Sequence, residues 1–219
     1  MLKQLPNALT LLRLILAPVV AWAVWQAYAT PVEAATTAPE NFDAELASAQ
    51  VWAVAAAVLF VFAALTDYFD GIAARALKVD SKFGRMLDPI ADKALVGLPL
   101  IAISIVAWRA QWPLAPAIIT ATVVIVLRDL LISLLRFAAR DGEGARVSPL
   151  AKWKTAVELV AVGLPILLAA APSIIQALGL GEGFAVSEEM TWFWVGLLTL
   201  AALLSAITAL QYLLAKSQP

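Results

Sequence analysis

Six stretches of the sequence are apolar for about 20 residues or more, the length that a helix needs to cross the hydrocarbon core of a bilayer. The 219 residues are 63% hydrophobic, and the mean hydropathy is +0.88. The apolar runs do not alternate with polar residues, so they are not strands of a membrane barrel. The sequence therefore predicts an all-α integral membrane protein with six transmembrane helices.

No repeat, linker or change of composition divides the chain, so we expect a single domain over residues 1–219. Residues 1–13 are predicted to form a short amphipathic segment at the membrane interface. Residues 30–47 carry four acids and no base and are predicted to be a loop, and residues 179–189 form a second acidic loop. The six spans are expected at about 11–29, 48–76, 85–107, 115–139, 151–178 and 190–214.

The distribution of basic residues predicts the orientation of the chain. If both termini lie in the cytoplasm, all of the 15 Lys and Arg residues except Arg109 lie on or near the inner side. Basic residues gather on the cytoplasmic side of membrane proteins. We therefore expect a multi-pass protein of a bacterial-type inner membrane with both termini in the cytoplasm.

The residue inventory limits the chemistry. The sequence contains no cysteine and no histidine, which excludes disulfides, thiol catalysis, zinc sites built from Cys or His, and a histidine base. Any reaction must use carboxylates, Lys, Arg, hydroxyl groups and bound metal ions.

Four carboxylates stand close together in otherwise apolar sequence. Asp67 and Asp70 end the second span, and Asp88 and Asp92 begin the third. Residues three or four apart share a helix face, and the turn at 76–83 can fold one helix back on the other, so the two faces can meet. Four negative charges at membrane depth are costly unless cations neutralise them. The sequence therefore predicts a site for divalent cations on the cytoplasmic side.

The ligand type indicates which metals are expected. Carboxylate oxygens favour hard cations, so we expect Mg²⁺ or Mn²⁺, and two such ions suit phosphoryl-type transfer. Gly71, Ala74 and Gly84 are small where two helices and a ligand would crowd together, which favours a ligand slot over simple helix packing.

Two other interpretations of the four acids stay open. They could form structural ion pairs with Arg75, Arg85 and Lys93, or they could mark the ion route of a divalent-cation transporter. The acids lie at the cytoplasmic ends of two spans, and no acid in the outer halves of the spans continues a route. Catalysis is therefore the favoured interpretation.

The spacing of these residues resembles the signature of the CDP-alcohol phosphotransferases. The matching pattern is Asp67-x-x-Asp70-Gly71-x-x-Ala74-Arg75, eight residues, then Gly84-x-x-x-Asp88-x-x-x-Asp92. Three further stretches are similar to family members that use glycerol 3-phosphate, and the similarity extends from about residue 5 to 165. These stretches are Asn7-x-x-Thr10-x-x-Arg13, residues 128–136 and Lys152-x-Lys154-Thr155.

The resemblance implies a reaction and a set of roles. The phosphatidyl group of CDP-diacylglycerol would pass to sn-glycerol 3-phosphate with release of CMP, in a homodimer whose active site opens to the cytoplasm and the inner leaflet. No nucleic-acid partner is expected. The implied metal ligands are Asp67, Asp70, Asp88 and Asp92, the last also serving as general base. The implied contacts to CDP-diacylglycerol are Asn7, Thr10, Arg13, Gly71, Ala74, Arg75 and Gly84.

An acceptor that carries a phosphate needs cations outside the metal site. Arg128 lies well inside the fourth span, where binding the acceptor is favoured over pairing with Asp129 or Glu158. Glu158 follows Lys154 by four residues, so we expect those two to form a structural pair. Asp129 departs from the family pattern, in which a glutamate usually follows the arginine. The cations predicted to bind the acceptor are Arg128, Arg136, Arg146, Lys152 and Lys154.

Alternatives to this reaction remain. A sister enzyme would use serine, inositol phosphate or a second phospholipid as the acceptor. The aspartate-rich membrane prenyltransferases have acidic motifs far apart in sequence and usually more spans. A divalent-cation carrier would move metal and release no CMP.

Overall fold

The computed structural model describes residues 5–37, 39–77, 82–138, 149–181 and 184–216. Within these ranges, the side chains of 5–6, 39, 68–77, 82–86, 136–138, 149–152 and 215–216 are not described. The described chain is helical, with no strand. Its elements are α1 (Leu5–Thr37), the short 3₁₀ helix η2 (Pro39–Asn41), α2 (Phe42–Leu77), α3 (Lys82–Arg109), α4 (Ala115–Ala138), α5 (Pro149–Ala177) and α6 (Glu188–Lys216).

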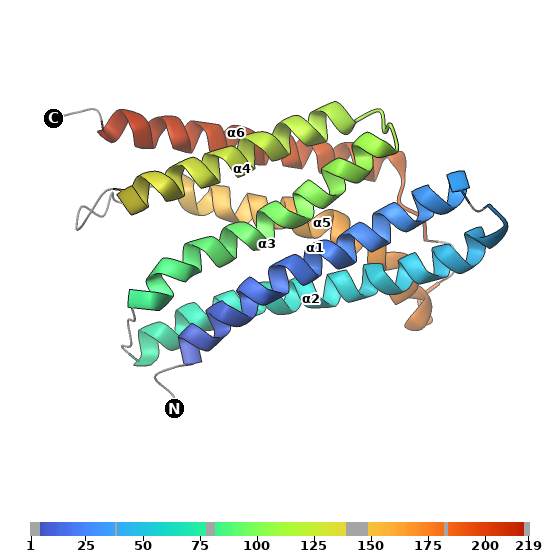
Figure 1. Ribbon diagram of the computed structural model, residues 1–219, viewed down its shortest axis with the longest axis horizontal. Helices are drawn as coiled ribbons and strands as arrows, with labels where there is room; N and C mark the ends of the chain where they lie inside the picture. The colour runs from blue at the N-terminus through green and yellow to red at the C-terminus, as the bar shows by residue number, and fades with distance from the viewer. Residues whose placement is uncertain (1–4, 38, 78–81, 139–148, 182–183, 217–219) are drawn as a thin grey trace.

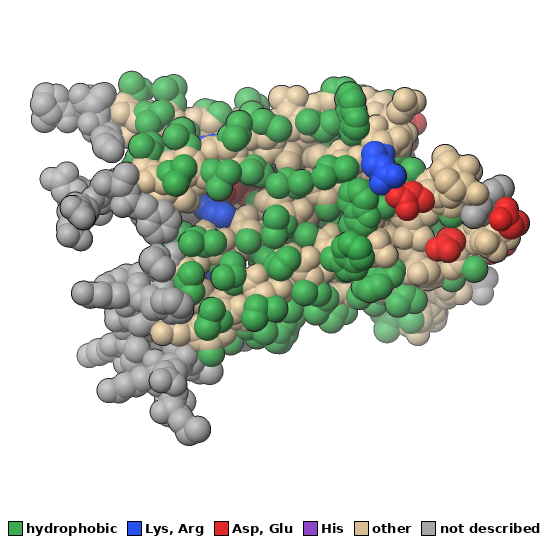
Figure 2. All heavy atoms as spheres, viewed as in Figure 1, with side chains coloured by type: hydrophobic (Ala, Val, Ile, Leu, Met, Phe, Trp, Pro, Cys, Tyr) green, Lys and Arg blue, Asp and Glu red, His purple; other side chains and the backbone are tan. Residues whose placement is uncertain are grey.

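The prediction of six transmembrane helices is confirmed, because six helices in the described chain are long and apolar enough to cross a membrane. Each of them overlaps one predicted span, and α1, α2, α3 and α6 extend beyond it at both ends. Large apolar side chains such as Val51, Leu134 and Phe193 are exposed on the outside of the bundle. Figure 2 shows hydrophobic side chains spread along the whole length of the bundle, as expected for a surface that meets lipid.

One sequence prediction about the first half of the chain needs correction. Residues 30–47 are not a loop: α1 continues to Thr37, η2 follows at Pro39–Asn41, and α2 begins at Phe42. The alanine-rich sequence in this region favours helix even where the hydrophobic run has ended. At the start of the chain, residues 5–13 belong to the same continuous helix as the first span.

The six long helices form a closed ring in which each packs against two neighbours. The order around the ring is α1, α2, α5, α6, α4, α3 and back to α1. Figure 1 shows that α1 begins and α6 ends at the same end of the bundle, on the left. The end of α2 and the beginning of α3, which carry the acidic motif, lie at that end too.

Small residues let the helices approach closely. Ala17 and Ala23 of α1 and Ala56 of α2 are almost completely buried. At the contact between α2 and α5, a Cβ atom on Gly163 would lie 2.8 Å from Cε1 of Phe60. The absence of a side chain at 163 therefore creates the space that the Phe60 ring fills.

A proline inside α5 explains one tertiary hydrogen bond. Pro165 has no N–H, so the carbonyl of Ala161, one turn earlier, has no partner within the helix. The indole Nε1 of Trp194 in α6 donates to this carbonyl at 2.9 Å. The hydrogen bond ties α5 to α6 and satisfies a backbone group where water is excluded.

The end of the bundle opposite the acidic motif carries exposed acids. Glu33, Glu40 and Asp43 are exposed there, and red acidic side chains gather at the right-hand end in Figure 2. Arg109, at the end of α3, pairs with Glu33 at 2.9 Å and lies over the ring of Trp25 at 5.7 Å.

Candidate active site

Two aspartates of the motif converge on one buried arginine. Nη1 of Arg13 in α1 lies 2.6 Å from Oδ1 of Asp67 in α2 and 2.5 Å from Oδ1 of Asp92 in α3. The arginine side chain is 1% exposed, whereas the two aspartate side chains are 56% and 48% exposed. The structure thus brings together one acid from each half of the motif, and both remain accessible.

The first helix also contacts a third aspartate. Oγ1 of Thr10 donates a hydrogen bond to Oδ1 of Asp88 at 2.5 Å. Thr10 and Arg13 are three residues apart on α1, and Asp88 and Asp92 are four apart on α3, so one face of each helix meets the other. Asn7, one further turn back on α1, is half-buried. The segment predicted to contact CDP-diacylglycerol therefore lies against the aspartates.

The donor set fits a hard divalent cation. Asp67 and Asp92 present oxygen ligands, and they already hold a positive charge between them, the guanidinium of Arg13. Among the side chains that the structure describes, no group of three or more acids lies close enough to hold a metal ion. The predicted ligand Asp70 lies outside the described side chains, as do Gly71, Ala74, Arg75 and Gly84.

A second charged cluster is centred on Asp129 in α4. Its Oδ1 lies 2.8 Å from Nη1 of Arg128 and 2.8 Å from Nζ of Lys154, and its Oδ2 lies 2.7 Å from Nζ of Lys93. Lys154 also contacts Oε2 of Glu158 at 2.7 Å. Three cations therefore share two carboxylates, and the cluster joins α3, α4 and α5.

Sequence reasoning placed some of this cluster correctly and missed part of it. The pair of Lys154 and Glu158 is confirmed. Arg128 contacts Asp129 and donates to Oγ1 of Thr208 in α6 at 3.0 Å. The structure places Arg128 and Lys154 together, whereas the side chains of Arg136, Arg146 and Lys152 lie outside those described.

Lys93 is a residue whose place the sequence did not reveal. It was considered as a counter-ion for the aspartates of the motif, but in the structure it pairs with Asp129. Neighbouring residues on a helix point in directions about 100° apart, so Lys93 leaves the face of Asp92 and reaches α4. The sequence did contain one indication: Lys93 directly follows a motif aspartate, so its side chain must point away from the face that carries Asp92.

One cavity connects the two clusters. It measures about 130 Å³ and is enclosed by α2, α3, α4 and α5. Asp67 and Asp92 lie on its wall, and so do Lys93, Asp129 and Glu158. A small molecule bound here would contact both the acidic pair and the charged cluster.

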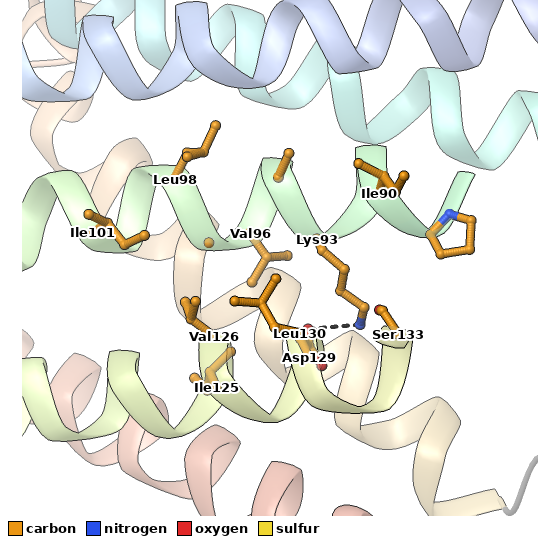
Figure 3. Close-up of a pocket in the computed structure, with 13 residues that line it drawn as sticks. Ile90, Lys93, Val96, Leu98, Ile101, Ile125, Val126, Asp129, Leu130 and Ser133 are labelled. Atoms are coloured by element: carbon orange, nitrogen blue, oxygen red, sulfur yellow. Dashed lines mark ion pairs between the residues drawn. The ribbon is translucent and has the colours of Figure 1, made fainter. Parts of the chain in front are cut away.

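A larger groove of about 320 Å³ lies between α3 and α4. Its lining is apolar along most of its length, and Figure 3 shows Lys93 of α3 reaching across to Asp129 of α4 near one end. Lys93, Val96 and Asp129 line both the groove and the smaller cavity. These three residues therefore separate the apolar groove from the smaller charged cavity.

Comparison with known proteins gives a consistent result. The family model described as CDP-alcohol phosphatidyltransferase matches residues 3–202. A CDP-diacylglycerol–glycerol-3-phosphate 3-phosphatidyltransferase of Cereibacter sphaeroides is 31% identical over 240 residues, covering 95% of this chain and 93% of the relative. A protein of the same name from Bacillus subtilis is 35% identical over 147 residues, 64% of this chain and 72% of the relative.

A third relative has a related name. A probable phosphatidylglycerophosphate synthase of Mycobacterium tuberculosis is 33% identical over 176 residues, covering 80% of this chain and 72% of the relative. No solved structure matches the chain.

Proposed function

Because the chain belongs to the CDP-alcohol phosphatidyltransferase family, we propose that it transfers the phosphatidyl group of CDP-diacylglycerol to sn-glycerol 3-phosphate, giving phosphatidylglycerophosphate and CMP. The observation that carries this proposal is the convergence of Asp67 and Asp92 beside a cavity that also reaches Lys93 and Asp129. Three relatives named for one acceptor or its product support the choice of glycerol 3-phosphate.

The motif aspartates would hold the metal. Asp67, Asp70, Asp88 and Asp92 supply oxygen ligands suited to two Mg²⁺ or Mn²⁺ ions. When bound, such ions neutralise diphosphate oxygens and stabilise the departing phosphate. The same ions would also neutralise the four aspartates, since uncompensated carboxylates at membrane depth are costly.

Asp92 would also take the proton of the attacking hydroxyl. The C1 oxygen of glycerol 3-phosphate forms a bond to the β-phosphorus of CDP-diacylglycerol, and the bond from that phosphorus to the oxygen of CMP breaks. The proton passes to the carboxylate of Asp92, which lines the cavity. With no histidine in the chain, a carboxylate is the available base at this place.

The two substrates would occupy different sides of the aspartates. Residues on α1 and in the motif would hold the nucleotide and its phosphates, and the cations around Asp129 would attract the phosphate of the acceptor. The nucleotide side comprises Asn7, Thr10, Arg13, Gly71, Ala74, Arg75 and Gly84. The acceptor side comprises Arg128, Arg136, Arg146, Lys152 and Lys154.

The setting of the enzyme follows from the charge distribution and the family. We propose an inner-membrane protein whose active site faces the cytoplasm, with both termini and a short N-terminal interfacial segment on that side. A homodimer is the proposed assembly. The basic residues near the acidic motif support this orientation, because positive charge favours the inner side.

An acceptor panel tests the proposed reaction. Purified protein is given CDP-diacylglycerol, Mg²⁺ and one acceptor at a time: glycerol 3-phosphate, serine, inositol phosphate or a second phospholipid. We expect CMP release and a new lipid product with glycerol 3-phosphate alone. CMP release with another acceptor would identify a sister enzyme. Metal flux into vesicles without CMP release would identify a cation transporter.

A further inference from the structure

Glu158 has one carboxylate oxygen without a hydrogen-bond partner among the residues that the structure describes. The side chain is 2% exposed, and its Oε2 pairs with Nζ of Lys154 at 2.7 Å. The other oxygen, Oε1, is buried and has no hydrogen-bond partner in the part of the chain that the structure describes. A buried acceptor on a charged group is costly to leave unsatisfied, so this oxygen has a reason to bind something.

The unused oxygen belongs to a residue on the wall of the cavity beside Asp92. Each of the other acids on this wall has at least one oxygen paired with a cation. Asp129 uses both of its oxygens on cations, and Asp67 and Asp92 share Arg13. Glu158 therefore brings a carboxylate with one unpaired, buried oxygen to the wall of this cavity, and Lys154 holds its other oxygen.

The chemistry of the acceptor substrate indicates what fills this position. Glycerol 3-phosphate has three polar parts: the reacting hydroxyl at C1, the phosphate and the hydroxyl at C2. The first belongs at Asp92, and the phosphate is repelled by a carboxylate oxygen. The C2 hydroxyl is the remaining group, and it can donate a hydrogen bond.

We propose that Oε1 of Glu158 accepts a hydrogen bond from the C2 hydroxyl of glycerol 3-phosphate and so selects acceptors that carry a hydroxyl next to the reacting carbon. This inference rests on the proposed function and adds a specificity-determining residue to it. A site built to pair with a substrate hydroxyl rejects the analogue that lacks it, because its own polar group is then left unpaired.

The test compares two acceptors in matched proteins. 3-Hydroxypropyl phosphate keeps the reacting hydroxyl and the phosphate of glycerol 3-phosphate but lacks the C2 hydroxyl. We expect wild-type kcat/KM to fall roughly 10- to 100-fold with this analogue, the size of a hydrogen bond to a charged group. In Glu158→Leu the two acceptors should differ by less than about threefold.

Two further variants complete the design. In Glu158→Gln, Lys154 takes the single amide oxygen, and the NH₂ group can only donate to the oxygen of the C2 hydroxyl. This neutral hydrogen bond replaces one to a charged group, so discrimination should fall below that of wild type, with little change in side-chain volume. Ser173→Ala is the control. Ser173 lies on the same helix, and its buried oxygen also lacks a hydrogen-bond partner among the described residues, but it does not line this cavity. It should discriminate like wild type.

The outcomes separate this inference from the proposed reaction. If the wild type converts both acceptors equally well, or if the Glu158 variants discriminate as strongly as wild type, the inference is overturned while the reaction stands. If the wild type forms no phosphatidylglycerophosphate from glycerol 3-phosphate, the proposed function fails first. Because the readout is a ratio within each protein, a partly destabilised variant still gives a valid answer.

Discussion

At the scale of single residues, Asp129 is the centre of the charge network. Its two oxygens contact cations from α3, α4 and α5, namely Lys93, Arg128 and Lys154. The aspartate side chain is 6% exposed, so these pairs are largely shielded from water. The short side chain of Asp129 can contact all three cations because the cations have long side chains that reach it.

Removing this carboxylate should destabilise the protein. Asp129→Ala leaves three cations around an empty position, and breaking a buried ion pair costs about 3 to 5 kcal/mol. We expect a loss of that size in the free energy of unfolding, measured by denaturant titration in detergent. Asp129→Glu keeps the charge and should lose much less. An Asp129→Ala protein as stable as wild type would show that the network does not hold the helices together.

Metal dependence should be measurable through one ligand. A chelator should abolish activity, and Mg²⁺ should restore it. Asp67→Asn removes one charged ligand, so the Mg²⁺ concentration for half-maximal activity should rise by about tenfold or more. Asp43→Asn, an exposed position at the other end of the same helix, is the control. An unchanged Mg²⁺ requirement in Asp67→Asn would remove this residue from the metal site.

The proximity of the motif aspartates could be predicted from the sequence, whereas the contacts that other helices make with them could not. Asp67 and Asp92 could be placed together because helical spacing and one short turn leave few other arrangements. The contact of Arg13 with both acids joins α1 to α2 and α3, and no local spacing encodes it. The unused oxygen of Glu158 likewise depends on which of its two oxygens Lys154 takes, which only side-chain geometry reveals.

At the scale of helices, hydrophobicity predicted the spans but not the helix ends. Apolar length reports how much of a helix lies in lipid, whereas the helix itself continues until its backbone is interrupted. Residues 30–47 show the difference: their acids end the hydrophobic run, but alanine-rich sequence carries the helices almost through the region.

The contact of α2 with α5 gives a prediction about helix packing. In Gly163→Leu the new side chain must displace the ring of Phe60, which a Cβ alone would approach at 2.8 Å. Overpacking of this kind typically costs about 1 to 3 kcal/mol, so the thermal midpoint in detergent should fall. Gly196→Leu, where a Cβ meets nothing within 4 Å, should be close to wild type. Equal midpoints for both variants would contradict the close contact.

At the scale of the whole molecule, the six-helix ring places the beginning of α1 and the end of α6 on the side of the acidic motif. The site lies where α1, α2 and α3 meet, and the charged cluster links it to α4 and α5. The interior is therefore polar at one end of a bundle whose outer surface is mostly apolar. Such an arrangement lets a water-soluble acceptor and a membrane lipid meet at one place.

The absence of cysteine allows a direct test of orientation. A single cysteine at Leu180, which is 74% exposed beyond α5, should react with a membrane-impermeant maleimide in intact cells. A single cysteine at Lys216, at the end of α6, should react only after the membrane is opened. The reverse pattern would place the active site on the outer side.

The most direct test of the account is lipid synthesis with and without the carboxylate of Asp92. Purified protein is incubated with CDP-diacylglycerol, Mg²⁺ and radiolabelled glycerol 3-phosphate, and the label in the lipid phase is measured. We expect strong labelling by the wild type and by Asp43→Asn, and a decrease of about 100-fold or more for Asp92→Asn, the loss typical of a missing general base. Labelling by Asp92→Asn equal to that of the wild type would contradict the proposal that this aspartate carries the reaction.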